Sequence, residues 1–350
     1  MRKILIVLGI LVVVIAGISV VYYRIWWSKP APTQPKAAPV IGFSLGAVVA
    51  DRWHTDRDLF VQRAEQLGAK VDVLQTSVDS DPATQISQIE NMISQGIKLI
   101  VVVAADSNKL GPEIQKAHDQ GIKIIAYDRL INDCDLDFYV SFDNVKVGAL
   151  QAQSVVSAKS SGNFVYLGGS PTDNNAFLVK QGAMSVLQPK IDSGDIKLVF
   201  DRFIPHWATD AAYSAMKSYL ATSTKVDAVV AANDKIALGA IKALAEAGLA
   251  GKVPVSGQDA ELSACQRIAQ GTQTSTVYKP IKNEADAAAE AAVAMINGQT
   301  PSVNNIINNK KINVPSYFIT PTLVTKDNLM TTVIKDGFHT YQEVYGTSAK

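Results

Sequence analysis

VIGFSLGAVVADRWHTDRDLFVQRAEQLG, residues 40–68, predicts a strand that leads directly into a helix. Residues 40–45 are mostly apolar, as in a strand of a parallel sheet that is covered on both faces. From Asp56 onward, apolar residues recur at helical spacing: Leu59, Phe60, Ala64 and Leu67. Gly68 follows them as a helix C-cap, so this stretch predicts the first unit of an α/β fold.

The loop between this strand and helix contains Asp51, Arg52 and Trp53. Open α/β sheets bind their ligands at the carboxyl ends of the strands, which is where this loop lies. A tryptophan ring stacks on the apolar face of a sugar or base, and an arginine donates hydrogen bonds to paired oxygens. The loop therefore predicts a ligand contact. The alternative is that Trp53 belongs to the core and Arg52 is a solvated surface charge.

The alternation of strand and helix continues along the chain. Strands are predicted at 70–75, 99–104, 123–127, 138–142, 163–167, 197–200, 228–232 and 253–256. Helices are predicted at 82–95, 107–120, 143–157, 174–187, 209–221 and 235–247. Such alternation requires parallel sheets with helices on both faces.

The pattern is built twice. The segments 99–106 and 227–234 resemble each other, as do 121–128 and 251–259, and each ends in an aspartate at the tip of a strand. We therefore expect two doubly wound parallel-sheet lobes, 40–141 with 280–313 and 142–279 with 314–340, that share a cleft. Strands at 274–278 and 314–324 and the Ala-rich helix 280–297 predict a multi-strand hinge between them.

The amino terminus predicts a membrane segment. Ile4 to Val21 is an apolar run of 18 residues that begins after Arg2 and Lys3 and ends in aromatic residues. We interpret residues 1–27 as an uncleaved transmembrane signal-anchor, with a cleaved signal peptide as the alternative. Residues 28–39 are Pro-rich and predict a linker. We therefore expect a single-pass protein of the cell membrane with its globular part outside the cytoplasm.

Composition argues against several classes of function. The net charge of +1 and the absence of a basic run indicate no nucleic-acid partner. No phosphate-binding loop, zinc-protease or serine-hydrolase motif occurs, and the four histidines are dispersed, so we expect no cofactor, no metal site and no enzyme. Cys134 and Cys265 are expected to be reduced, and a bridge between them stays open.

Polar residues gather at the predicted strand ends, with acids, amides, cations and aromatics in mixture. This mixture suits a neutral polyhydroxylated ligand, whose hydroxyls donate and accept, better than a phosphate, which requires donors only. For Asp143, Asn174 and Asp234 the alternative is a helix N-cap. The collected groups are Asp51-Arg52-Trp53, Asp128-Arg129, Asp143-Asn144, Asp173-Asn174-Asn175, Trp207, Asn233-Asp234, Gln258-Asp259 and Lys279.

Seven segments in order resemble the bacterial D-xylose-binding proteins, within the ribose/galactose-type family of periplasmic sugar-binding proteins. They are AYDRLIND (126–133), FYVSFDNVKVG (138–148), GGSPTDNNA (168–176), VDAVVAANDKIALGAI (226–241), VSGQDAEL (255–262), GTQTSTVYKPI (271–281) and TVIKDGFH (332–339). The resemblance implies a type I periplasmic binding protein fold and D-xylose as the ligand. By similarity, the xylose contacts fall on Arg52, Trp53, Asp128, Arg129, Asp173, Asn175, Trp207, Asn233, Asp259 and Lys279.

The membrane partner follows from the predicted anchor. Tethering raises the effective concentration of the binding lobes beside a neighbouring membrane protein and removes the advantage of a diffusing carrier. We therefore favour xylose sensing with a sensor histidine kinase. The alternative is the substrate-binding component of an ABC xylose importer, and a sugar-modifying enzyme is the least favoured interpretation.

Overall fold

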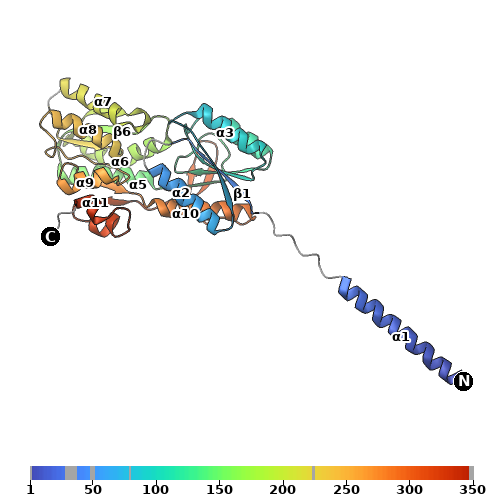
Figure 1. Cartoon of the computed structure of the whole chain (residues 1–350). Coiled ribbons are helices and arrows are strands. Elements are labelled where there is room, and N and C mark those ends of the chain that lie inside the picture. Colours follow the sequence, from blue (N-terminus) through green and yellow to red (C-terminus); the bar gives the residue numbers. More distant parts are fainter. Residues whose placement is uncertain (1, 28–37, 48–51, 79, 223–224, 347–350) are drawn as a thin grey trace. The chain divides into compact units, whose positions relative to one another are not determined.

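The computed structural model describes residues 2–27, 38–47, 52–78, 80–222 and 225–346 (Figure 1). Residues 1–38 and residues 39–350 form two separate compact units. Asp51, which we expected beside the ligand, lies outside the described residues.

The first unit contains one helix, α1, Arg2–Trp27. Over the described part of the chain, no helix is long and apolar enough to cross a membrane. The transmembrane anchor that we predicted at residues 1–27 is therefore not supported. Most of the predicted linker, residues 28–39, falls outside the described residues.

The second unit begins with a seven-stranded sheet of order β10-β11-β5-β4-β3-β1-β2. Its strands pair in parallel except for β10, which is antiparallel to β11. The strands are β1 Val40–Leu45, β2 Lys70–Gln75, β3 Leu99–Val103, β4 Lys123–Tyr127, β5 Phe138–Phe142, β10 Asn305–Asn308 and β11 Asn313–Ile319. We call this sheet and its helices the first lobe.

Helices cover both faces of this sheet because its central strands are apolar on both sides. On one face lie α2 (Arg52–Gln66) and α10 (Ile281–Ile296), which run side by side (Figure 1). On the other face lie α3 (Pro82–Ser94) and α4 (Gly111–Asp119). In β3, Val101 faces the α2 and α10 core and its neighbour Val102 faces the opposite core, so the strand is buried on both faces.

A three-stranded parallel sheet of order β7-β6-β8 forms the second lobe. Its strands are β6 Gly162–Gly168, β7 Ile196–Phe203 and β8 Ala228–Ala231. Its helices are α5 Asn144–Ala158 and α6 Asn174–Asp192 on one face, and α7 Thr209–Thr222 and α8 Asp234–Glu246 on the other. The strand that we expected at 253–256 is reduced to one bridge, between Val255 and Val229.

A smaller layer completes the unit. Strands β9 (Thr276–Tyr278) and β12 (Thr322–Val324) pair antiparallel. The apolar cluster below them includes residues of α9 (Leu262–Gln270), the π-helical turn η2 (Met330–Ile334) and α11 (Tyr341–Tyr345). Helix α9 and strand β10 were not predicted from the sequence.

The chain passes between the lobes three times, from β5 to α5, from β9 to α10 and from β11 to β12. We expected one crossing strand at 314–324 and placed residues from 314 onward in the second lobe. The structure instead contains two strands, and β11 pairs with β5 in the first lobe. Pro321 lies between them, and a proline has no backbone N–H to continue a ladder.

Candidate functional site

The carboxyl ends of the strands of both lobes surround one cavity with about 490 Å³ of empty space, including space open to solvent. All ten predicted contacts line this cavity, together with four further side chains. The lining residues are Arg52, Trp53, Asp128, Arg129, Asn144, Asp173, Asn175, His206, Trp207, Asn233, Lys235, Gln258, Asp259 and Lys279.

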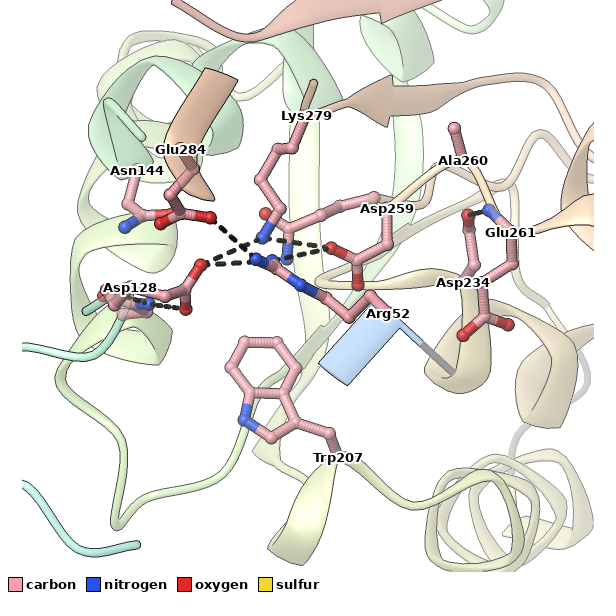
Figure 2. Close-up of polar contacts among 12 residues, drawn as sticks. Arg52, Asp128, Asn144, Trp207, Asp234, Asp259, Ala260, Glu261, Lys279 and Glu284 are labelled. Carbon is pink, nitrogen blue, oxygen red and sulfur yellow. Dashed lines mark hydrogen bonds and ion pairs between the residues drawn. The ribbon is translucent and has the colours of Figure 1, made fainter. Parts of the chain in front are cut away.

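Arg52 occupies the centre of the site, in the first turn of α2 (Figure 2). The helix begins at Arg52, so our prediction that Arg52 and Trp53 lie in a loop before a helix starting at Asp56 is wrong. Starting four residues earlier places Arg52 and Asp56 one turn apart, and the two side chains form a buried ion pair of 3.0 Å. The interpretation of Arg52 as a solvated surface charge is also wrong, because its side chain is only 7% exposed.

The guanidinium of Arg52 meets three further carboxylates. Its Nη1 lies 3.1 Å from Asp128 Oδ2 and 3.7 Å from Asp259 Oδ1, and its Nη2 lies 2.8 Å from Glu284 Oε2. A guanidinium offers five donors in a plane, which is how one side chain serves so many acceptors. Arg52 therefore links residues of both lobes.

Lys279 is the second cation of this cluster and follows β9 in one of the connections between the lobes. Its Nζ lies 3.0 Å from Asp259 Oδ1 and 3.8 Å from Asp128 Oδ2 (Figure 2). Burial by itself raises the pKa of Asp128, but the charges of Arg52, Lys279 and Arg129 outweigh it and hold that pKa below its usual value. Asp128 is therefore an ionised acceptor in the cavity.

Asp259 is held in an unusual backbone conformation. Its φ is 95° and that of Ala260 is 50°, a region that residues with a side chain seldom occupy. Hydrogen bonds on both sides hold the loop, because Asp259 N–H donates to Val277 O at 2.9 Å and Ala260 N–H donates to Thr276 Oγ1 at 3.1 Å. The loop presents the Asp259 carboxylate to Lys279.

Asp234 lies behind this loop and does not line the cavity. Its carboxylate accepts a hydrogen bond from Glu261 N–H at 3.0 Å (Figure 2). It also accepts from Thr276 Oγ1 at 2.9 Å and from Gln273 Nε2 at 2.8 Å. Burial, followed by the charges of Glu261 and Asp259, raises its pKa well above the usual value. Asp234 therefore supports the loop that carries Asp259.

Arg129 and Asp173 form the opposite wall. Arg129 Nε lies 3.0 Å from Asp173 Oδ2, and Trp207 Nε1–H donates to the same oxygen at 3.2 Å. The guanidinium of Arg129 also lies 5.2 Å from the ring centre of Trp53, and that of Arg52 lies 4.5 Å from it. Both cations thus contact a ring that we predicted as a stacking surface.

Trp207 is presented by a strained turn. His206 and Trp207 both have a φ of 56°, in the left-handed region. The indole packs against Gly169, where an added Cβ would lie 2.1 Å from the ring. Only glycine at position 169 leaves room for this placement of Trp207.

Helices α5, α6 and α8 begin beside the cavity, which tests whether the polar residues there are helix N-caps. Asp143 accepts from Lys146 N–H and caps α5. The caps of α6 and α8 are Asp173 and Asn233, so the capping alternative is wrong for Asn174 and Asp234. Asp173 and Asn233 also line the cavity. Asn175 donates from Nδ2 to Asp128 Oδ1 at 2.9 Å. Capping and lining are therefore compatible at Asp173 and Asn233, because a cap uses one side-chain oxygen only.

The model of the periplasmic binding protein domain matches residues 41–300. The chain belongs to the periplasmic binding protein family. The match confirms the type I periplasmic binding protein fold with parallel sheets that the sequence predicted.

Relatives of this periplasmic binding protein include two named sugar-binding proteins. The D-xylose-binding periplasmic protein of Escherichia coli K12 is 50% identical over 305 residues, 87% of this chain and 92% of that protein. The protein of the same name from Haemophilus influenzae is 51% identical over 306 residues, with the same two shares. An ABC transporter solute-binding protein from Clostridium phytofermentans with bound β-D-glucose has 29% identity and a TM-score of 0.80, over 87% of this chain and 99% of that chain.

Sequence analysis of this periplasmic binding protein did not select Asn144, Gln258, His206 or Lys235, although the first two were among the strand-end groups. It also missed the buried residues behind the cavity. Asp56 follows Arg52 by four residues, the spacing of an ion pair within a helix, so this contact could have been predicted from the sequence. Glu284 lies in an Ala-rich helix, and its partner Arg52 is 232 residues away, so no local pattern points to it.

Proposed function

We propose that this periplasmic binding protein binds one molecule of D-xylose in the cavity between its lobes. The observation that carries the proposal is the mixed lining of the cavity: carboxylates, amides, cations and two tryptophans from both lobes converge there. Sugar hydroxyls both donate and accept hydrogen bonds, so they match such a lining, and a tryptophan ring matches the C–H face of a pyranose. The names of the relatives with about half of their residues identical support the choice of D-xylose.

Selectivity would arise from buried groups that lose their partner when a hydroxyl changes position. A buried polar group without a partner costs about 1–3 kcal/mol, and more when it is charged. Eight of the ten proposed contacts are less than a tenth exposed, and the others are Asp259 and Trp207. The proposed site therefore discriminates between sugars that differ at one carbon.

Isothermal titration of the full-length protein tests this proposal. D-xylose should give saturable heat with one site per chain, and D-ribose and D-glucose should give little. Xylitol, which keeps the configuration of the hydroxyls at C2 to C4 but has no ring, separates recognition of the ring from recognition of those hydroxyls. Absence of saturable heat with any pentose contradicts the proposal.

We also propose that the bound sugar is delivered to an ABC importer. The sensor-kinase interpretation rested on a membrane anchor, which the described helices do not support. The relatives are named as periplasmic binding proteins, and a similar solved structure is named as an ABC transporter solute-binding protein, which favours import. A partner of either kind must distinguish the closed from the open lobes, since a ligand acts only through its different affinities for the two.

Co-purification of the full-length protein from its own cells, with and without xylose, distinguishes the two partners. A permease and its ATPase should be recovered. Recovery of a histidine kinase in a xylose-dependent complex, without a permease, would overturn the import proposal.

A further inference from the structure

A buried cluster of charges, four of which line the cavity, contains more acids than bases. Arg52 and Lys279 are its two cations. Four carboxyl groups contact one or both of them, those of Asp56, Asp128, Asp259 and Glu284. The positive charge of the nearby Arg129 is balanced by Asp173, with which it forms an ion pair. Unbalanced negative charge in a dry interior is costly, and protonation of one acid relieves it.

The four carboxylates differ in the number of hydrogen bonds and ion pairs that their oxygens make. Asp56 accepts two hydrogen bonds from Arg52 and one from the hydroxyl of Tyr127. Glu284 is fully buried and accepts one, from Arg52 Nη2 at 2.8 Å, whereas its Oε1 has no hydrogen-bond partner among the described residues. Asp128 Oδ2 and Asp259 Oδ1 also lack a hydrogen-bond partner among the described residues, but each lies within ion-pair distance of Arg52 and Lys279. Glu284 Oε1 has no such cation, so Glu284 is the least stabilised carboxylate of the set and the proton belongs on it.

We propose that Glu284 takes up a proton when the lobes close on the sugar, and that it sets the orientation of Arg52 as a positioning residue. This inference rests on the proposed function. Glu284 itself lines no part of the cavity, so it acts on the ligand through Arg52 alone.

Closure changes the surroundings of Glu284 through Asp259. A sugar enters so buried a cavity only when the lobes separate, and Asp259 then leaves with the second lobe. In this structure the Asp259 carboxylate lies 3.0 Å from Lys279 Nζ and 3.7 Å from Arg52 Nη1, so it shares the two cations that stabilise an ionised Glu284. Closure therefore makes the ionised form of Glu284 less favourable and draws in a proton.

Charged and titratable groups of both signs face Glu284 from the neighbouring elements. They are Arg52 and Asp56 of α2, Tyr127 of β4, Asp128 after it, Tyr139 of β5 and Lys279 before α10. Burial, and after it the charge of Asp128, raises the pKa of Glu284 well above its usual value against the opposing charge of Arg52. The two tyrosines stay neutral because burial raises their pKa values as well.

Proton uptake on binding makes the affinity for the sugar fall as pH rises. A group whose pKa is higher in the bound than in the free protein favours binding fully below the lower pKa. That contribution declines as pH rises between the two values. For one proton the affinity falls by at most about tenfold per pH unit in that window.

Calorimetric titration with xylose from about pH 6 to about pH 9, in buffers of different ionisation enthalpy, measures the protons taken up per sugar bound. Wild type should take up as much as one proton and bind more weakly as pH rises. Glu284→Gln, which mimics the neutral acid, should take up none and bind with an affinity that is flat with pH. Glu290→Gln, at an exposed position of the same helix, is the matched control, which should bind xylose and take up the proton as wild type does.

Two results would overturn the inference: saturable xylose binding by wild type without proton exchange across this range, or proton uptake that persists in Glu284→Gln. The wild-type measurement stands by itself if the variant fails to fold. Failure of the proposed function looks different, because wild type would then give no xylose heat at any pH, and the inference would fall with it.

Discussion

Arg129 and Asp173 form an ion pair in the wall of the cavity, with Arg129 Nε 3.0 Å from Asp173 Oδ2. Arg129 follows β4 of the first lobe and Asp173 caps α6 of the second, so the pair joins the two lobes directly. Their side chains are only 6% and 4% exposed. Removing one partner would therefore leave a buried charge without a counter-charge, which is costly in free energy.

Arg129→Ala should weaken xylose binding by well over tenfold, because it leaves Asp173 buried without its cation and removes a donor from the cavity. Titration calorimetry measures the loss. Arg57→Ala is the control, since Arg57 is a half-buried residue of the helix that carries Arg52 and lines no part of the cavity, and it should bind as wild type does. Affinity within twofold of wild type in Arg129→Ala contradicts the proposed site.

Asp259→Asn should also cost more than tenfold in affinity. The substitution keeps the size of the side chain but removes the charge that pairs with Lys279 at 3.0 Å, so the buried ammonium loses part of its compensation. Equilibrium binding is the measurement, with the exposed Asp58→Asn as the matched control. Unchanged binding in both variants would show that Asp259 has no part in recognition.

Gly169→Ala should abolish tight binding while the protein still folds. The new methyl would lie 2.1 Å from the ring of Trp207, so the indole must move out of the cavity wall. The tryptophan fluorescence change on adding xylose and the thermal midpoint report on site and fold separately. Gly111→Ala is the control, since its nearest neighbour would be at 3.6 Å, and it should behave as wild type.

Asp234→Asn should change the pH dependence of stability. Burial raises the folded-state pKa of Asp234 well above 3.8, so its favourable contribution is complete below the unfolded pKa. That contribution is lost as pH rises through the raised pKa, by up to about 1.4 kcal/mol per pH unit. Thermal unfolding across pH should show wild type losing stability relative to the variant as pH rises. A difference between the two that is constant with pH would contradict this.

Cys134 and Cys265 are both free and buried. Burial raises the pKa of each thiol to about 12, so neither forms a reactive thiolate near neutral pH. A thiol reagent should label neither residue in the native protein and both after denaturation without reductant. If denaturation releases no thiol, the two cysteines are bridged, and the alternative left open by the sequence is correct.

The sequence by itself determined most of the elements, the fold class and the general place of the site. Alternation of apolar strands with helices of period 3.6 requires parallel sheets, and the carboxyl ends of parallel strands meet at one edge. The residues after β4 and before α6 and α8 were therefore expected to converge on a cleft, and Asp128, Asp173 and Asn233 line one cavity. The spacing of apolar residues within each strand and helix is enough to predict these features.

Only the tertiary structure decided what each charge does. Asp143, Asp234 and Asp259 all lie at strand ends, yet the first caps a helix, the second supports a loop and the third faces the cavity. The role of Glu284 depends on Arg52, which lies 232 residues away in the sequence and is brought to it by the packing of α10 on α2. Electrostatic energies fall with distance in space and not along the chain, so folding alone sets which acids share a cation.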